Sequence, residues 1–247
     1  MSLRALLVAL ALAALVGAPA SAATRAGLTV WPARVRLDAG AAAVVHVANA
    51  TARPQVLAGR VAGFALDLRG TPRIVRTSDG TPLVRLDPAR LVVPPHGVGA
   101  FTVRVARSVQ AAPGDHPALV LVTAQSSGGA GIGVRLRIGV SVEVRVAGAI
   151  VHRLRILGVR VRGGRRFVVA VVNRGNVAER LMRRVVVLRL WRGRRLLAVL
   201  PPRARELLPG TRGVVEFVAP RRLRGRLRVV VAAPRAGGAE RSFSVSP

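Results

Sequence analysis

Histidine and acidic side chains are the residues of this 247-residue chain that could perform acid–base chemistry or bind a metal. The four histidines stand far apart, and none has the spacing of a zinc-binding pair: His46, His96, His116 and His152. The chain has no cysteine, which excludes thiol catalysis, disulfides and cysteine-ligated metals. It also has no Gly-x-Ser-x-Gly motif, and no nucleophile motif lies beside His116. The sequence therefore predicts no catalytic residue, no metal and no cofactor.

Arginine supplies all 40 basic side chains, which face 10 acidic ones and give a net charge of +30. Guanidinium groups bind phosphates and carboxylates through paired hydrogen bonds. Residues 151–247 hold 24 of the arginines and only four acids. Two clusters at expected turns are candidate polyanion-binding residues: Arg192, Arg194, Arg195, Arg221, Arg222 and Arg224. The alternative is that these arginines only keep exposed strand faces in contact with water and prevent sheet edges from pairing with other chains. The lack of lysine is also typical of a GC-rich genome, which codes for arginine more often.

The first 22 residues have the three-part pattern of a secretory signal peptide. Arg4 precedes the apolar run 5–16, and the segment ends in the small residues Ala20-Ser21-Ala22. The run is shorter than the ~20 residues that span a bilayer. We therefore expect export to the cell envelope, cleavage after Ala22 and no C-terminal membrane anchor, with an uncleaved signal anchor as the alternative. An exported chain with five Phe, two Trp and no Tyr is better suited to anionic envelope polymers than to specific nucleic acids.

Short apolar runs separated by Gly, Pro, Asn and Asp predict an all-β protein. The clearest run is 132–146, where every even-numbered residue is Ile, Val or Leu. Such alternation predicts a strand with one face in a core. Gly139 is expected to bend this strand, so that one segment changes sheets or partners. The glycine-rich residues 128–133 just before it predict a flexible hairpin loop.

The composition shifts after Gly148, and about seven short strands with turns every 8–12 residues follow it. This pattern is typical of an immunoglobulin-like sandwich, and the preceding segment fits a similar one. We predict a signal peptide at 1–22 and two tandem immunoglobulin-like β-sandwich domains at 23–148 and 149–247. Asn49 and Asn173 each close an apolar strand, which favours two related modules.

The order of motifs along the chain resembles that of two families of exported bacterial proteins. The motifs are Pro32–Val35, Val45-x-Val47-x-Asn49, Pro94–Gly97, Ala112–His116 and Asn173–Val177. They resemble those of WxL-interacting proteins, which are described as having a peptidoglycan-binding immunoglobulin-like domain and a C-terminal companion. This resemblance implies association with the cell wall and binding to partner surface proteins. More distantly, the chain resembles periplasmic pilus-assembly chaperones.

The resemblance to the chaperones implies a role for one arginine. In those proteins an arginine of the first strand helps to anchor the terminal carboxylate of a client, and Arg34 occupies the matching place. Their second anchor is a lysine in the last long strand of the first domain, and this sequence has no lysine. Arg135 and Arg137, in the alternating segment, complete the candidate partner-binding residues.

The leading hypothesis from the sequence is a non-catalytic binding or scaffolding protein of the cell envelope. Its arginine-rich second domain would bind cell-wall polymer or another anionic surface. Its first domain would offer a strand to a surface or pilin-like protein by strand addition. The alternative is a periplasmic chaperone-like assembly factor for surface proteins, and an enzyme comes third.

Overall fold

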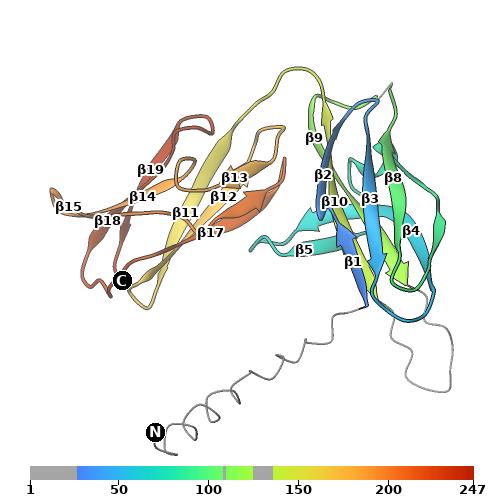
Figure 1. The fold of residues 1–247 in the computed structure, drawn as a ribbon. Coiled ribbons are helices and arrows are strands. Elements are labelled where there is room, and N and C mark those ends of the chain that lie inside the picture. The colour runs from blue at the N-terminus through green and yellow to red at the C-terminus, as the bar shows by residue number, and fades with distance from the viewer. Residues whose placement is uncertain (1–26, 108–109, 125–135) are drawn as a thin grey trace, which may run out of the picture.

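The computed structural model describes residues 27–107, 110–124 and 136–247, so the expected signal peptide lies outside the described residues. Figure 1 shows two β-sandwiches joined by a short connection, which confirms the predicted all-β fold with two immunoglobulin-like sandwiches. The one helical element in the described ranges is a short 3-10 turn, η1 (Thr81–Leu83). In the same ranges, no helix has the length and apolar character needed to cross a bilayer.

The first sandwich has two sheets around one core. The first sheet has the strand order β1-β3-β8-β6, with strands at Leu28–Trp31, Ala42–Asn49, Val98–Val105 and Val84–Asp87. The second has the order β2-β10-β9-β4-β5, with β7 also paired to β4, and its strands are Arg34–Asp38, Arg137–Val146, Gly114–Ala124, Gln55–Leu66, Pro72–Val75 and Arg90–Val93. Alternate residues of both sheets meet in the core, as the period of a strand requires. Phe101 of β8 and Val140 of β10 are fully buried there.

The chain changes sheets between β1 and β2. Strand β1 is antiparallel to β3 in the first sheet, whereas β2 is parallel to β10 in the second. Pro32 lies between them and has no N–H to donate, so it cannot continue either ladder. The register of β10 with β9 runs without a shift from Arg137 through Gly139 to Val146. Residues 137–146 stay in one sheet, so a change of sheet at Gly139 is wrong for this segment; on the other side of β10, pairing with β2 begins only at Ser141.

The second sandwich has its own core, in which Phe167, Phe217 and Leu188 are fully buried. One sheet has the order β11-β12-β17, with strands at Leu154–Arg162, Arg166–Asn173 and Arg212–Val218. The other has the order β15-β14-β18-β19, with strands at Arg195–Leu200, Val187–Arg192, Leu227–Ala233 and Ala239–Val245. A short pair, β13 (Glu179–Leu181) and β16 (Arg205–Leu207), completes it. The division of the chain at residue 148 stays a prediction.

Two buried asparagines have the same role in the two sandwiches. Asn49 ends β3 and Asn173 ends β12, and both side chains are almost completely buried. Each side-chain oxygen accepts the backbone N–H two residues further on, from Thr51 and Gly175 respectively. Each side-chain N–H₂ group donates to backbone carbonyls of neighbouring loops and strands. The similarity between the two sequence segments therefore has a structural counterpart.

Candidate functional site

The first part of the candidate site is the free edge of β10. The Ser141 N–H donates to the Ala33 carbonyl at 3.1 Å, beside β2, whereas the Leu136 carbonyl accepts from β9. Because the N–H and C=O of one strand residue share a side and successive residues alternate, the peptide groups of Arg137 and Gly139 point away from β9. Within the described ranges no strand pairs with these two residues on that side. With respect to the described residues, 137–140 of β10 are therefore an open sheet edge.

Apolar side chains lie along this edge. Val140 is fully buried, whereas Ile138 and Leu136 are half-buried and pack against the core of the first sandwich. Arg137, one of the predicted partner-binding residues, is exposed at the beginning of β10. Arg135 and the earlier part of the alternating segment lie outside the described residues. The edge thus combines free peptide groups with apolar side chains that are not completely covered.

Arg34, the second predicted partner-binding residue that the structure describes, is held by two carboxylates of its own chain. Its Nη1 donates to Glu206 Oε2 at 2.8 Å, and its Nη2 donates to Glu143 Oε2 at 2.8 Å. The hydrogen bond to Glu206, followed by the bond to Glu143, raises the pKa of Arg34 above its ordinary value despite partial burial. Glu143 lies on β10 and Glu206 on β16, so Arg34 joins the two sandwiches.

Asp115 of β9 is a second link between the sandwiches, and its side chain is only 1% exposed. It forms a close ion pair with Arg145 Nε, and its Oδ2 lies 3.7 Å from Arg36 Nη2. The hydrogen bond from Arg145 to Asp115 raises the pKa of Arg145. Across the interface, Asp115 Oδ2 accepts the N–H of Ala178 at 2.8 Å, and its own N–H donates to the Asn176 carbonyl at 2.8 Å. Asp115 therefore links charged strands of the first sandwich to a loop of the second.

The hairpin between β4 and β5 provides a third link. The Leu68 carbonyl accepts the Val214 N–H at 2.8 Å and also the Arg205 Nη1 at 2.6 Å. Burial lowers the pKa of Arg205, whose side chain donates to three backbone carbonyls, those of Leu68, Glu206 and Val214. Beside Arg34, a cleft of about 560 Å³ lies between the sandwiches, lined by Arg34, Arg36, Ala178, Glu179, Arg180, Met182, Val185 and Glu206.

The predicted polyanion-binding residues lie at one end of the second sandwich. Arg192 Nη2 donates to the Arg224 carbonyl at 2.8 Å, so the structure brings the two predicted turns together. Arg222 Nε donates to the Gly163 carbonyl at 3.1 Å, in the hairpin between β11 and β12. The remaining members, Arg194, Arg195 and Arg221, are exposed. Polyanion binding by this group stays a prediction.

The sequence analysis missed Glu143, Glu206 and Asp115. Arg34 is 109 residues from Glu143 and 172 residues from Glu206, and no local pattern links residues so far apart. Glu206 also lies on a three-residue strand, too short to show an alternating pattern. One signal could have pointed to them. The chain has 10 acidic residues for 40 arginines, so any carboxylate is expected to have an arginine as an ion-pair partner.

Comparison with known proteins adds a likeness of fold. No family model matches the chain, and no curated protein matches it in sequence. A chain in the chaperone–tip adhesin complex of CFA/I fimbriae superposes with a TM-score of 0.53 at 10% identity, over 90% of this chain and 98% of that one.

A second solved structure, the class 5 fimbriae chaperone CfaA, also gives a TM-score of 0.53, at 11% identity over 89% of this chain and 99% of that one. These matches give no support to the resemblance to WxL-interacting proteins or to peptidoglycan binding. They agree instead with the more distant resemblance to pilus-assembly chaperones. At this identity the likeness establishes the fold, which is the fold of a two-domain fimbrial chaperone.

Proposed function

We propose that the protein is a non-catalytic, chaperone-like assembly factor that acts outside the cytoplasm and binds a surface or pilin-like subunit by strand addition. The observation that supports this function is the open edge of β10, where the peptide groups of Arg137 and Gly139 have no partner strand among the described residues. An extended segment that pairs with an open edge gains main-chain hydrogen bonds, and side-chain pockets supply its specificity. The fold of a fimbrial chaperone agrees with this function.

The partner is expected to contribute an extended segment with alternating apolar residues. Its backbone would pair with residues 137–140, and its apolar side chains would cover Ile138 and Leu136, which are half-buried without it. Main-chain hydrogen bonds and apolar contacts respond weakly to salt, whereas polyanion binding through several arginines weakens steeply as salt rises. A salt-resistant protein partner therefore distinguishes strand addition from binding to an anionic wall polymer.

Gly139 offers a direct test of strand addition. A Gly139→Pro substitution removes an N–H that points to the open edge and leaves the ladder to β9 intact. The matched control, Gly139→Ala, keeps this N–H, and its added Cβ meets only the flexible Leu119 side chain, at 3.2 Å. We expect the wild type and Gly139→Ala to retain the same protein from an envelope fraction at moderate salt. Gly139→Pro is expected to lose at least about tenfold in affinity for it, equivalent to ~1.4 kcal/mol.

A photo-crosslinking residue in place of Arg137 identifies the contact in the same experiment. Strand addition predicts a crosslink to one extended segment of the retained protein. Equal retention by both Gly139 variants, or crosslinks scattered over the partner's surface, would show that the β10 edge does not bind it. Retention only on isolated wall material at low salt would favour the polyanion-binding hypothesis.

Glu206 is expected to compete with a partner's terminal carboxylate for Arg34. Glu206→Ala frees part of the Arg34 guanidinium, and ion pairs near the protein surface contribute up to ~1 kcal/mol. We expect this variant to bind the retained subunit about fivefold more tightly when its C-terminus is free, and unchanged when it is amidated. Titration calorimetry measures both affinities. Glu216→Ala, which removes a weaker pair with Arg166 at 4.0 Å, is the control. Equal affinities for the two forms of the subunit would exclude Arg34 as a carboxylate anchor.

A further inference from the structure

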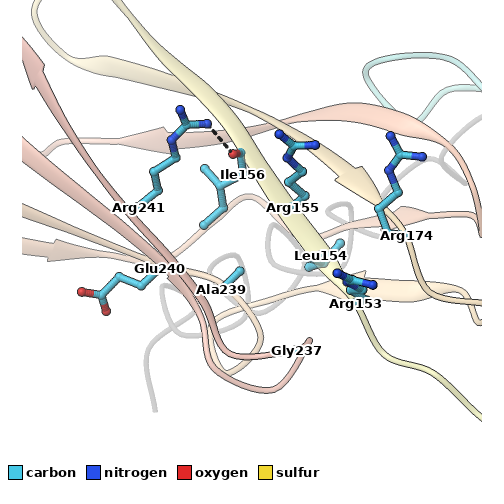
Figure 2. Close-up of a pocket in the computed structure, with 9 residues that line it drawn as sticks. All are labelled: Arg153, Leu154, Arg155, Ile156, Arg174, Gly237, Ala239, Glu240 and Arg241. Carbon is cyan, nitrogen blue, oxygen red and sulfur yellow. Dashed lines mark hydrogen bonds between the residues drawn. The ribbon is translucent and has the colours of Figure 1, made fainter.

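A cavity of about 660 Å³ opens between β11 and β19, the edge strands of the two sheets of the second sandwich. Its lining consists of Arg153, Leu154, Arg155, Ile156, Arg174, Gly237, Ala239, Glu240 and Arg241. Figure 2 shows the guanidinium groups of Arg155, Arg174 and Arg241 pointing to the same side. Leu154 and Ile156, which are also in the lining, are buried. The cavity is therefore an arginine-rich hollow, separate from the predicted polyanion-binding residues.

The positive charge of this cavity is not neutralised by the protein. Among the described residues no carboxylate lies within 4.0 Å of the four lining arginines. Glu240 is the one acidic residue in the lining, and it pairs instead with Arg189 at 3.7 Å. Figure 2 shows its side chain directed away from the arginine groups. A ligand with one negative charge would leave most of this charge unbalanced.

Hydrogen bonds fix the Arg241 side chain and the backbone that carries Arg153 and Arg174. Arg241 Nη1 donates to the carbonyls of Ile156 at 3.1 Å and Leu157 at 3.2 Å, which connects β19 to β11. The Arg153 carbonyl accepts the N–H groups of Arg174 at 2.7 Å and Gly175 at 3.1 Å. A Cβ at residue 175 would lie 2.1 Å from the Val151 carbonyl, so only glycine allows this close packing. Binding groups on fixed backbone lose less freedom when a ligand binds.

The geometry points to a binding site for a ligand that carries two or more phosphate charges. Guanidinium groups bind phosphate oxygens through paired hydrogen bonds, and a phosphate monoester carries about −1.5 to −2 charges at neutral pH. The cavity has the size of a small-molecule site, far larger than one phosphate ion needs. The ligand is thus a phosphorylated head group or a short phosphate polymer. This site does not depend on strand addition by β10.

Inorganic tripolyphosphate is a suitable probe, with titration calorimetry on the purified chain at low salt. The test variant is Arg155→Gln with Arg174→Gln, which leaves the structural contacts of Arg241 intact. The control is Arg183→Gln with Arg184→Gln, two exposed arginines in the turn between β13 and β14 that belong neither to the cavity nor to the predicted polyanion-binding residues; it lowers the net charge by the same amount. We expect the test variant to bind at least about tenfold more weakly, and the control to change by less than about threefold. Thermal unfolding of both variants checks that the fold is kept.

Equal losses in the two double variants would overturn the proposal, because they would show that the net charge of +30 attracts the anion without a site. Failure of the wild type to bind tripolyphosphate would overturn it as well. Vesicles of phosphatidylglycerol mixed with phosphatidylcholine identify the source of the phosphate. A head-group site predicts that the test variant also loses binding to these vesicles relative to the control. A site for a soluble phosphate compound predicts equal vesicle binding by the two variants.

Discussion

Asn173→Ala is expected to lower the free energy of unfolding by about 3 kcal/mol, because each buried backbone group left without a partner costs ~1–3 kcal/mol. The Asn173 side chain donates to the carbonyls of Val177 at 2.7 Å and Leu207 at 3.2 Å. It also accepts the Gly175 N–H at 2.9 Å. None of these three groups can gain water without opening the end of β12. Urea-induced unfolding measures the change.

The control for Asn173→Ala is Gln55→Ala, which removes a side-chain amide that is less buried. Gln55 donates one bond of 3.3 Å to Thr51, and Gln55→Ala is expected to cost less than ~1 kcal/mol. Asn49→Ala should behave like Asn173→Ala, with hydrogen exchange accelerated in the first sandwich instead of the second. Similar stabilities of Asn173→Ala and Gln55→Ala would mean that the buried amide contributes little.

Asp115→Ala is expected to cost about 2–3 kcal/mol, because a hydrogen bond to a charged group contributes ~1.5–3 kcal/mol and the Arg145 left behind is partly exposed. The substitution leaves Arg145 without its close carboxylate and the Ala178 N–H without its acceptor. Because Asp115 joins the two sandwiches, small-angle scattering is expected to show a wider range of relative orientations as well. Thermal unfolding gives the loss of stability.

Two further variants define the role of Asp115. Asp115→Asn keeps a side-chain acceptor for the Ala178 N–H and removes the charge, so it should lie between the wild type and Asp115→Ala. Asp79→Ala removes an exposed acid and is expected to change stability by less than ~0.5 kcal/mol. If Asp115→Ala kept the wild-type scattering profile, Arg34 and the β4–β5 hairpin would be sufficient to hold the two sandwiches.

Much of the fold could be predicted because strands impose a local pattern. The alternating residues of 132–146 predict a strand, and β10 occupies the described part of it. The turns around Asn49 and Asn173 are also local, because each asparagine bonds the N–H two residues further on. Strands β13 and β16 were missed, since three residues do not complete a recognisable period. Pairing partners such as β2 and β10 depend on contacts more than a hundred residues apart.

The candidate site could be predicted only in part, for the same physical reason. The sequence drew attention to Arg34, but its neighbours Glu143 and Glu206 are supplied by distant strands. The arginine-rich composition indicated anion binding, and it directed attention to turns where arginines are adjacent in sequence. The cavity between β11 and β19 instead assembles Arg155, Arg174 and Arg241 from three separate segments. Clusters made by folding are not visible as runs of sequence.

The link at Leu68 has a consequence for how this protein can diverge. The two hydrogen bonds from the β4–β5 hairpin to the second sandwich, from the Val214 N–H and Arg205 Nη1, are both accepted by the Leu68 carbonyl. The Leu68 residue itself is 61% exposed. Every amino acid has this carbonyl, so residue 68 can change its side chain freely while the angle between the sandwiches is preserved. On the other side, the Val214 N–H is lost only on substitution by proline. Substitutions at residue 68 can therefore change the surface of this hairpin while its hydrogen bonds to the second sandwich are kept.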